Sequence, residues 1–250
     1  MDDLQLIHPR WPAPRNVRSI ITTRNGGSSV DTYASLNLSY KVGDMDSNVT
    51  KNRDKLFGRL KSAPYTIMKR PAWPEQTHSN AVVESSSITD ATKADAVFTK
   101  TPHDICGIMT ADCLPVFLCD QKGTEVAVAH AGWRGLAYGV IYETVKKLSA
   151  PRNQILAYLG PAISSRHYEV NFDLVRTFID LDQSYEGCFK PTKNHKFKAD
   201  LYALAKRQLR SLGITKVFGG AYCTFHQSDI FFSFRRDGMT GRMAALIWLE

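Results

Sequence analysis

The sequence predicts a mixed α/β fold, and three observations support this. Apolar segments of strand length recur along the chain, and amphipathic segments of helical period separate some of them. Strands and helices do not alternate regularly, which argues against a Rossmann arrangement. The chain has 250 residues, of which 43% are hydrophobic and 22% charged, as in an average globular protein. This length fits one large domain or two small ones.

Strands are expected to dominate the first half of the chain. Val17–Thr23 is an apolar strand that ends at a polar turn, and a helix near 48–61 is capped by Asp46 or Ser47. Two further strands flank Asp120-Gln121-Lys122-Gly123, which is typical of a hairpin turn, so their outer ends should lie together. The expected strands are Ala81–Glu84, Ala96–Thr99, Ile105–Thr110, Pro115–Cys119 and Glu125–Ala129.

Helices and strands are mixed in the second half. Leu136–Leu148 has apolar residues at helical spacing, which predicts a helix. Gly160-Pro161 ends the expected strand Ile155–Leu159. Further helices are expected near 171–182 and 200–212, the second ended by Gly213. The expected strands are Ile155–Leu159, Val217–Gly219, Ile230–Phe234 and Met243–Trp248.

Composition limits the partners and the compartment. With 32 Lys and Arg against 24 Asp and Glu, the net charge of +8 favours anionic ligands such as phosphates. The basic residues are scattered and form no nucleic-acid motif, so we expect no nucleic-acid partner. Five cysteines without a CxxC pair do not indicate a disulfide framework. The N-terminus lacks signal-peptide features and no apolar run reaches membrane-spanning length, so we expect a cytoplasmic protein without a membrane partner.

Three side chains suit a soft or borderline divalent metal: His78, Cys113 and His130. Structural zinc sites are closed by four ligands, whereas catalytic sites use three and keep one position open. Cys113 and His130 are 17 residues apart across the expected hairpin, at strand ends where scaffolds present reactive side chains. Spacing alone favours a buried inert cysteine and two ordinary histidines. If the three converge, the open position indicates a site for chemistry.

Eight segments together resemble the bacterial laccase-domain family, most closely its YfiH-like branch. The resemblance covers nearly the whole chain, from about Trp11 to Leu249. Proteins of this family carry the names multicopper polyphenol oxidoreductase, purine nucleoside phosphorylase and peptidoglycan editing factor. The segments are Thr23-Arg24-Asn25-Gly26-Gly27-Ser28, Ser35-Leu36-Asn37-Leu38, Asn52-Arg53, Gln76-Thr77-His78, Thr110-Ala111-Asp112-Cys113-Leu114-Pro115, His130-Ala131-Gly132-Trp133-Arg134-Gly135, Leu159-Gly160-Pro161-Ala162-Ile163 and Phe231-Phe232-Ser233-Phe234-Arg235-Arg236-Asp237.

The resemblance implies a single domain over residues 1–250 with mixed sheets in a layered α/β/β/α arrangement. It implies a zinc site at His78, Cys113 and His130, which are then catalytic, with copper as the alternative metal. It also implies phosphorolysis of adenosine, inosine and methylthioadenosine, with adenosine deamination as a second activity. We expect the purine nucleoside and phosphate to be bound from within the resembling segments. The candidate substrate-binding residues are Arg24, Asn37, Arg53, Asp112, Arg134 and Arg236.

Other chemistries remain open at this stage. The main alternative is a peptidoglycan-editing hydrolase that acts on a UDP-muramyl precursor. Cys113 with His130 as its base would instead form a thiol-hydrolase dyad, and a structural zinc site would need a fourth ligand. A multicopper laccase needs His-X-His pairs, and this chain has seven histidines and no such pair, although a single His₂Cys copper site is compatible. Both a monomer and a homodimer fit the sequence.

Overall fold

Three sheets organise residues 4–250 in the computed structural model of the chain. The six-stranded sheet has the order β12-β8-β6-β7-β4-β3, formed by Lys216–Gly219, Ile155–Leu159, Leu114–Asp120, Val126–Ala131, Ala96–Thr99 and Val82–Glu84. The four-stranded sheet has the order β1-β2-β13-β5, formed by Leu6–Ile7, Val17–Thr22, Met243–Leu249 and Cys106–Thr110. A small sheet has the order β10-β11-β9, formed by Phe189–Pro191, Phe197–Ala199 and Glu169–Val170.

Alternating side chains of β6 separate two layers of core. Val116 and Leu118 point to one face of the six-stranded sheet and pack against helices. Phe117 and Cys119 point to the other face and pack against the four-stranded sheet, where they meet residues such as Ile108. All seven β6 residues are buried, which explains why the strand is apolar from Leu114 to Cys119.

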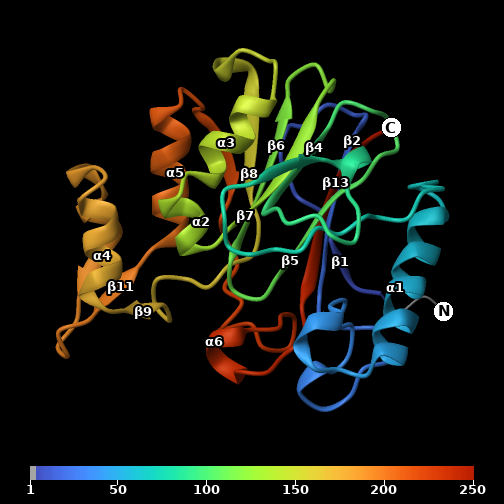
Figure 1. The fold of residues 1–250 in the computed structure, drawn as a ribbon, viewed down its shortest axis with the longest axis horizontal. Helices are drawn as coiled ribbons and strands as arrows, with labels where there is room; N and C mark the ends of the chain where they lie inside the picture. Colours follow the sequence, from blue (N-terminus) through green and yellow to red (C-terminus); the bar gives the residue numbers. More distant parts are fainter. Residues whose placement is uncertain (1–3) are drawn as a thin grey trace.

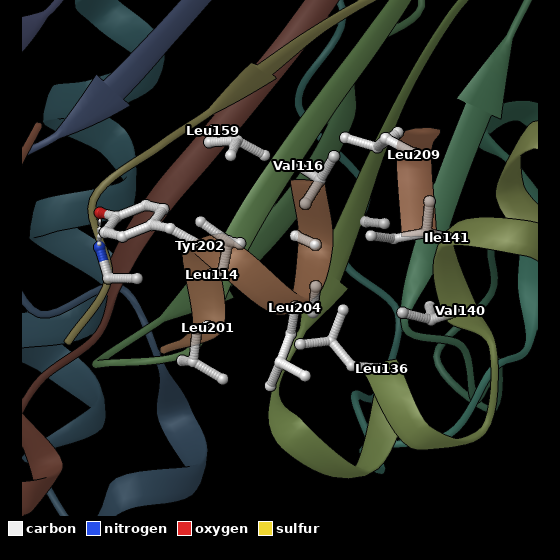
Figure 2. Packing of buried hydrophobic residues seen from close by; sticks show 14 of the residues in the cluster. Leu114, Val116, Leu136, Val140, Ile141, Leu159, Leu201, Tyr202, Leu204 and Leu209 are labelled. Atoms are coloured by element: carbon white, nitrogen blue, oxygen red, sulfur yellow. Dashed lines mark hydrogen bonds between the residues drawn. The ribbon is translucent and has the colours of Figure 1, made fainter. Parts of the chain in front are cut away.

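Helices cover the outer face of each sheet, on opposite sides of the strands (Figure 1). Helices α2, α3 and α5 lie over the six-stranded sheet, and Figure 2 shows their leucines and valines packed against Leu114, Val116 and Leu159. Helix α1 packs Leu56 and Leu60 onto the four-stranded sheet. The expected layered α/β/β/α arrangement is therefore confirmed. The helices are α1 (Asp46–Lys61), α2 (Trp133–Ala137), α3 (Val140–Lys147), α4 (Phe172–Ile179), α5 (Leu201–Ser211) and α6 (Phe234–Asp237).

Two predicted elements are wrong. The expected helix Leu136–Leu148 is two helices, because Gly139 adopts a left-handed φ of 81° between α2 and α3. The expected strand Ile230–Phe234 pairs with no strand of the described chain. Phe231 and Phe232 fill a separate small core as a loop, and Ser233 then caps α6 by accepting a hydrogen bond from the Arg236 amide.

Two expectations from the sequence concern a signal peptide and a membrane-spanning segment. Residues 1–3 lie outside the described residues, and with them the expectation that the N-terminus carries no signal peptide. None of the helices within residues 4–250 is long and apolar enough to span a membrane.

Candidate metal centre and cavity

His78, Cys113 and His130 converge as the sequence predicts. Their ligand atoms all lie within 4.8 Å of one another. The Cys113 Sγ is 3.9 Å from the His78 Nε2, and the two imidazole centroids are 4.9 Å apart. Among residues 4–250 this is the one group of three or more His, Cys, Asp or Glu side chains that could hold a metal ion.

The β6–β7 hairpin brings two of these residues together. Antiparallel pairing places Pro115 opposite His130, so Cys113, just before β6, lies beside the end of β7. Gly132 follows at this point, and a Cβ atom there would be 2.8 Å from the Cys113 Sγ and 3.2 Å from the His78 Cδ2. Only a glycine leaves the space between these ligands open.

The buried carboxylate of Asp95 fixes the two histidines. It accepts hydrogen bonds from the backbone amides of Thr77, His78 and Ser79 at 3.1, 3.0 and 2.6 Å. These bonds hold His78 at a φ of 60°, a left-handed conformation that non-glycine residues rarely adopt. The His130 Nδ1 donates to the same carboxylate at 2.8 Å, which leaves its Nε2 for a metal.

Charge in the group favours a thiolate. Burial alone would raise the pKa of the Cys113 thiol, but His130 and His78 outweigh burial and bring this pKa to about 6. Burial would lower the pKa of His130, yet Cys113 and Asp95 raise it to about 9. Asp95 is also buried, and its hydrogen bond and charge interaction with His130 bring its pKa to about 2. The group therefore holds the deprotonated sulfur that a metal requires.

The alkylation rate of Cys113 in the metal-free protein tests this arrangement. Because the pKa of Cys113 is below the usual value of about 9, the rate with iodoacetamide should rise between about pH 5 and 7 and then level off. Site-specific mass spectrometry over pH 5 to 10 measures this, with Cys223 as a half-exposed comparison. A Cys113 rate that still climbs above about pH 8 would contradict it.

A cavity of about 900 Å³ opens at the candidate metal ligands. Five basic side chains line it, together with aromatic rings from helices and loops. The basic residues are Lys41, Arg53, Arg134, Arg235 and Arg242, and the aromatic residues are Tyr40, Trp73, Trp133, Tyr168 and Phe234. The wall therefore combines surfaces that suit anions with surfaces that suit a flat ring.

Of the six expected substrate-binding residues, Arg53, Asp112 and Arg134 line this cavity. Asp112 has a structural role as well. Its carboxylate accepts hydrogen bonds from the hydroxyls of Thr224 and Ser233 and from the Arg235 amide. Asp112 thus ties the Cys113 loop to α6, which carries Arg235 into the cavity.

The other three expected residues are absent from the described cavity wall. Arg24 donates to the carbonyls of Ala34 and Ser228. The Asn37 carboxamide oxygen accepts from the amides of Ser39 and Arg242. Arg236 donates to the carbonyls of Thr224, Phe225 and Phe231 and pairs with Asp237. Hydrogen bonds to loop backbone therefore occupy these three side chains.

Sequence reasoning missed Asp95, Arg235 and Arg242. A carboxylate directly before an apolar strand was a usable signal for Asp95, because a buried charge needs partners. Arg235 lies beside the expected Arg236, and side-chain direction alone distinguishes them. Arg242 stands alone between Gly241 and the last strand, and nothing in its surroundings marks it.

Comparisons with known proteins identify the family and its fold. A family model described as multi-copper polyphenol oxidoreductase laccase matches residues 18–250. A purine nucleoside phosphorylase of Haemophilus influenzae is 42% identical over 249 residues, which cover 99% of this chain and 100% of the relative. Purine nucleoside phosphorylase YfiH of Escherichia coli is 44% identical over 246 residues, 98% of this chain and 99% of the relative. The crystal structure of a Neisseria meningitidis DUF152 protein has a TM-score of 0.92 at 45% identity and covers 98% of this chain and 99% of that one.

Proposed function

This chain belongs to the multi-copper polyphenol oxidoreductase laccase family, and on that basis we propose that it is a zinc-dependent purine nucleoside phosphorylase. Its substrates are adenosine, inosine and methylthioadenosine, and adenosine deamination is a second activity. The observation that carries the proposal is the convergence of His78, Cys113 and His130 at a cavity lined by arginines. Relatives named purine nucleoside phosphorylase match over almost their full length, which supports an enzyme of this kind.

The donor set suits zinc. Two imidazoles and one thiolate are ligands that zinc prefers, and three of them leave a position for water or substrate. Asp95 orients His130 as carboxylates orient metal-bound histidines in many such sites. Zinc bound by these three side chains would supply Lewis-acid chemistry at the cavity wall.

Three arginines provide the phosphate site. Arg134, Arg235 and Arg242 all line the cavity that opens at Cys113, and the Arg235 guanidinium carbon lies 4.9 Å from the Tyr168 ring centroid. None of the three guanidinium groups forms an ion pair with a carboxylate within the described part of the chain. Converging cations without carboxylate partners favour a multiply charged anion, and guanidinium binds phosphate with two parallel hydrogen bonds.

This geometry assigns the protein a positioning role in phosphorolysis. A phosphate oxygen forms the new bond to the ribose C1′ while the bond from C1′ to the purine nitrogen breaks. The departing base keeps the electron pair and takes up a proton. The arginines hold phosphate against C1′, and rings such as Trp133 and Tyr168 offer flat apolar surface for the base.

Product analysis with adenosine and phosphate tests the proposal. We expect adenine and ribose 1-phosphate, and inosine as the deamination product. Substituting Arg134 by Met should raise the KM for phosphate about 10-fold, because one charge-assisted contact is lost, and should change the KM for adenosine much less. Arg210→Met, at the end of α5 and absent from the cavity wall, is the control. Hydrolysis of a UDP-muramyl-serine substrate without any phosphorolysis would replace this proposal with the peptidoglycan-editing alternative.

Metal content separates this proposal from copper oxidase chemistry. The ligand count cannot build a multicopper cluster, so protein purified without added copper should contain about one zinc per chain. Phenol oxidation should be slow and should require added copper. Elemental analysis, visible absorption and oxygen uptake measure this. Stoichiometric copper with an intense blue band and matching oxygen consumption would favour the oxidoreductase.

A further inference from the structure

A second cationic position lies where two cavities meet. Tyr40, Arg53, Pro71 and Trp73 line both the main cavity and a smaller neighbouring cavity of about 190 Å³. Arg53 projects from α1, which covers the four-stranded sheet, whereas Cys113 and His130 lie at adjoining ends of β6 and β7 in the six-stranded sheet. The cavity wall therefore reaches from the metal ligands to a different layer of the fold.

The surroundings of Arg53 hold its side chain in place. The Nε donates to the Leu38 carbonyl at 2.8 Å. The guanidinium carbon lies 4.4 Å from the Tyr40 ring centroid and 5.6 Å from that of Trp73. With two rings against the planar group, hydrogen bonding through its terminal N–H edge is the interaction left for a ligand.

Neighbouring charges are paired, and that of Arg53 is not. Lys41 pairs with Glu75 at 2.9 Å, and Arg70 pairs with Asp54 at 2.8 Å. Within residues 4–250, Arg53 forms no ion pair, and its two terminal nitrogens have no hydrogen-bond acceptor. A half-buried guanidinium with a free, pre-oriented edge is suited to a planar or tetrahedral anion.

The main cavity also has room for more than one anion. Its volume is near the upper end of the range of about 300–1,000 Å³ that ligand pockets span. Arg134, Arg235 and Arg242 already supply cations at the metal end. Arg53 also lines the smaller cavity, which none of those three arginines lines. Arg53 is thus placed apart from the cations of the metal end.

We propose that Arg53, held between Tyr40 and Trp73, forms a second anion subsite, and that the preferred substrate is a purine nucleoside with an anionic group on its ribose. This inference rests on the proposed function for the nucleoside part. The substituent is a phosphate or carboxylate that the Arg53 N–H edge binds while the glycosidic bond lies at the metal end. Neutral nucleosides leave this subsite to water and bind less tightly.

Calorimetric titration with adenosine and with adenosine 5′-monophosphate tests the subsite. The titrations use metal-free protein, so that neither ligand is consumed, and excess inorganic phosphate is present throughout, so that it occupies the arginines of the metal end. The wild-type protein should bind the monophosphate about 10-fold or more tightly than adenosine, because a charge-assisted bidentate contact is added. Arg53→Met, which keeps the apolar stem, should remove this preference, and Arg53→Lys should retain part of it.

Arg70→Met is the matched control. It removes a neighbouring arginine of the smaller cavity that is already paired, and it should leave the preference intact. Equal affinity for the two ligands in the wild type, or a preference that survives in both Arg53 variants, would overturn the subsite. Adenosine 5′-carboxylate in a third titration separates carboxylate from phosphate recognition. A preference for the monophosphate without any phosphorolysis would support the subsite and contradict the proposed reaction. Phosphorolysis without that preference would contradict the subsite alone.

Discussion

Substituting Cys113 by Ala should lower phosphorolysis of adenosine by about 10³-fold or more, because a catalytic metal supplies several kcal/mol of charge stabilisation. The protein should lose its metal and keep its fold. Cys113 is only half-buried and sits between β5 and β6, so the change removes a ligand without emptying the core.

Steady-state kinetics, elemental analysis and a thermal unfolding scan measure these three effects on the same preparation. Cys223→Ala is the control, since Cys223 is also half-buried but contacts Ser164 away from the cavity wall. Full activity in a metal-free Cys113→Ala protein would show that the metal is incidental to turnover.

Substituting Asp95 by Asn should weaken metal binding by roughly 10–100-fold and destabilise the fold by about 3 kcal/mol. The asparagine keeps the shape of the side chain but removes the charge. Its NH₂ group would face amide donors that now point at a carboxylate oxygen. His130 would lose the partner that fixes which of its nitrogens is free.

Stability against pH gives a second signature of Asp95. Its pKa is about 2 in the folded chain and about 3.8 without the surrounding structure. The carboxylate therefore contributes stability that is present above about pH 4 and is lost as the pH falls through about 2. Urea unfolding of the metal-free proteins should show the gap between wild type and Asp95→Asn narrowing over this interval.

Asp120→Asn provides a matched control. Asp120 is also buried and accepts hydrogen bonds from the amides of Lys122, Thr124 and Glu125 at the hairpin turn. Its variant should lose stability but keep the affinity for zinc in a chelator competition. Equal loss of zinc affinity in both variants would show that Asp95 acts only through the fold.

Local pattern predicted β6, β7, β8 and β13 well because every residue of these strands is buried. Apolar runs such as Val126–Ala131 and Met243–Leu249 are distinctive over their whole length. The errors arose where an apolar run serves a loop, as in Ile230–Phe234, or where one residue changes the backbone, as Gly139 does. The small sheet of β9, β10 and β11 was missed because strands of two or three residues give no periodic signal.

The convergence of the candidate ligands was predictable because chemistry restricts the residue type. Few side chains bind a soft metal, so His78, Cys113 and His130 were identifiable before their convergence was known. An arginine fits a loop carbonyl as well as it fits an anion. All four of Arg24, Arg236, Arg235 and Arg242 donate to backbone carbonyls, but only Arg235 and Arg242 also line the cavity, and tertiary packing alone decides this.

Gly132 offers a diagnostic for interpreting other sequences of this family. Any side chain at this position would intrude between the sulfur and the His78 ring, even with all three ligands intact. A homologue that retains the ligand triad but carries a bulkier residue here would be metal-free and catalytically silent, a pseudoenzyme that a three-residue signature misclassifies. A genome survey that predicts metal binding in this family should therefore examine four positions: the three ligands and the glycine, whose role is to have no side chain.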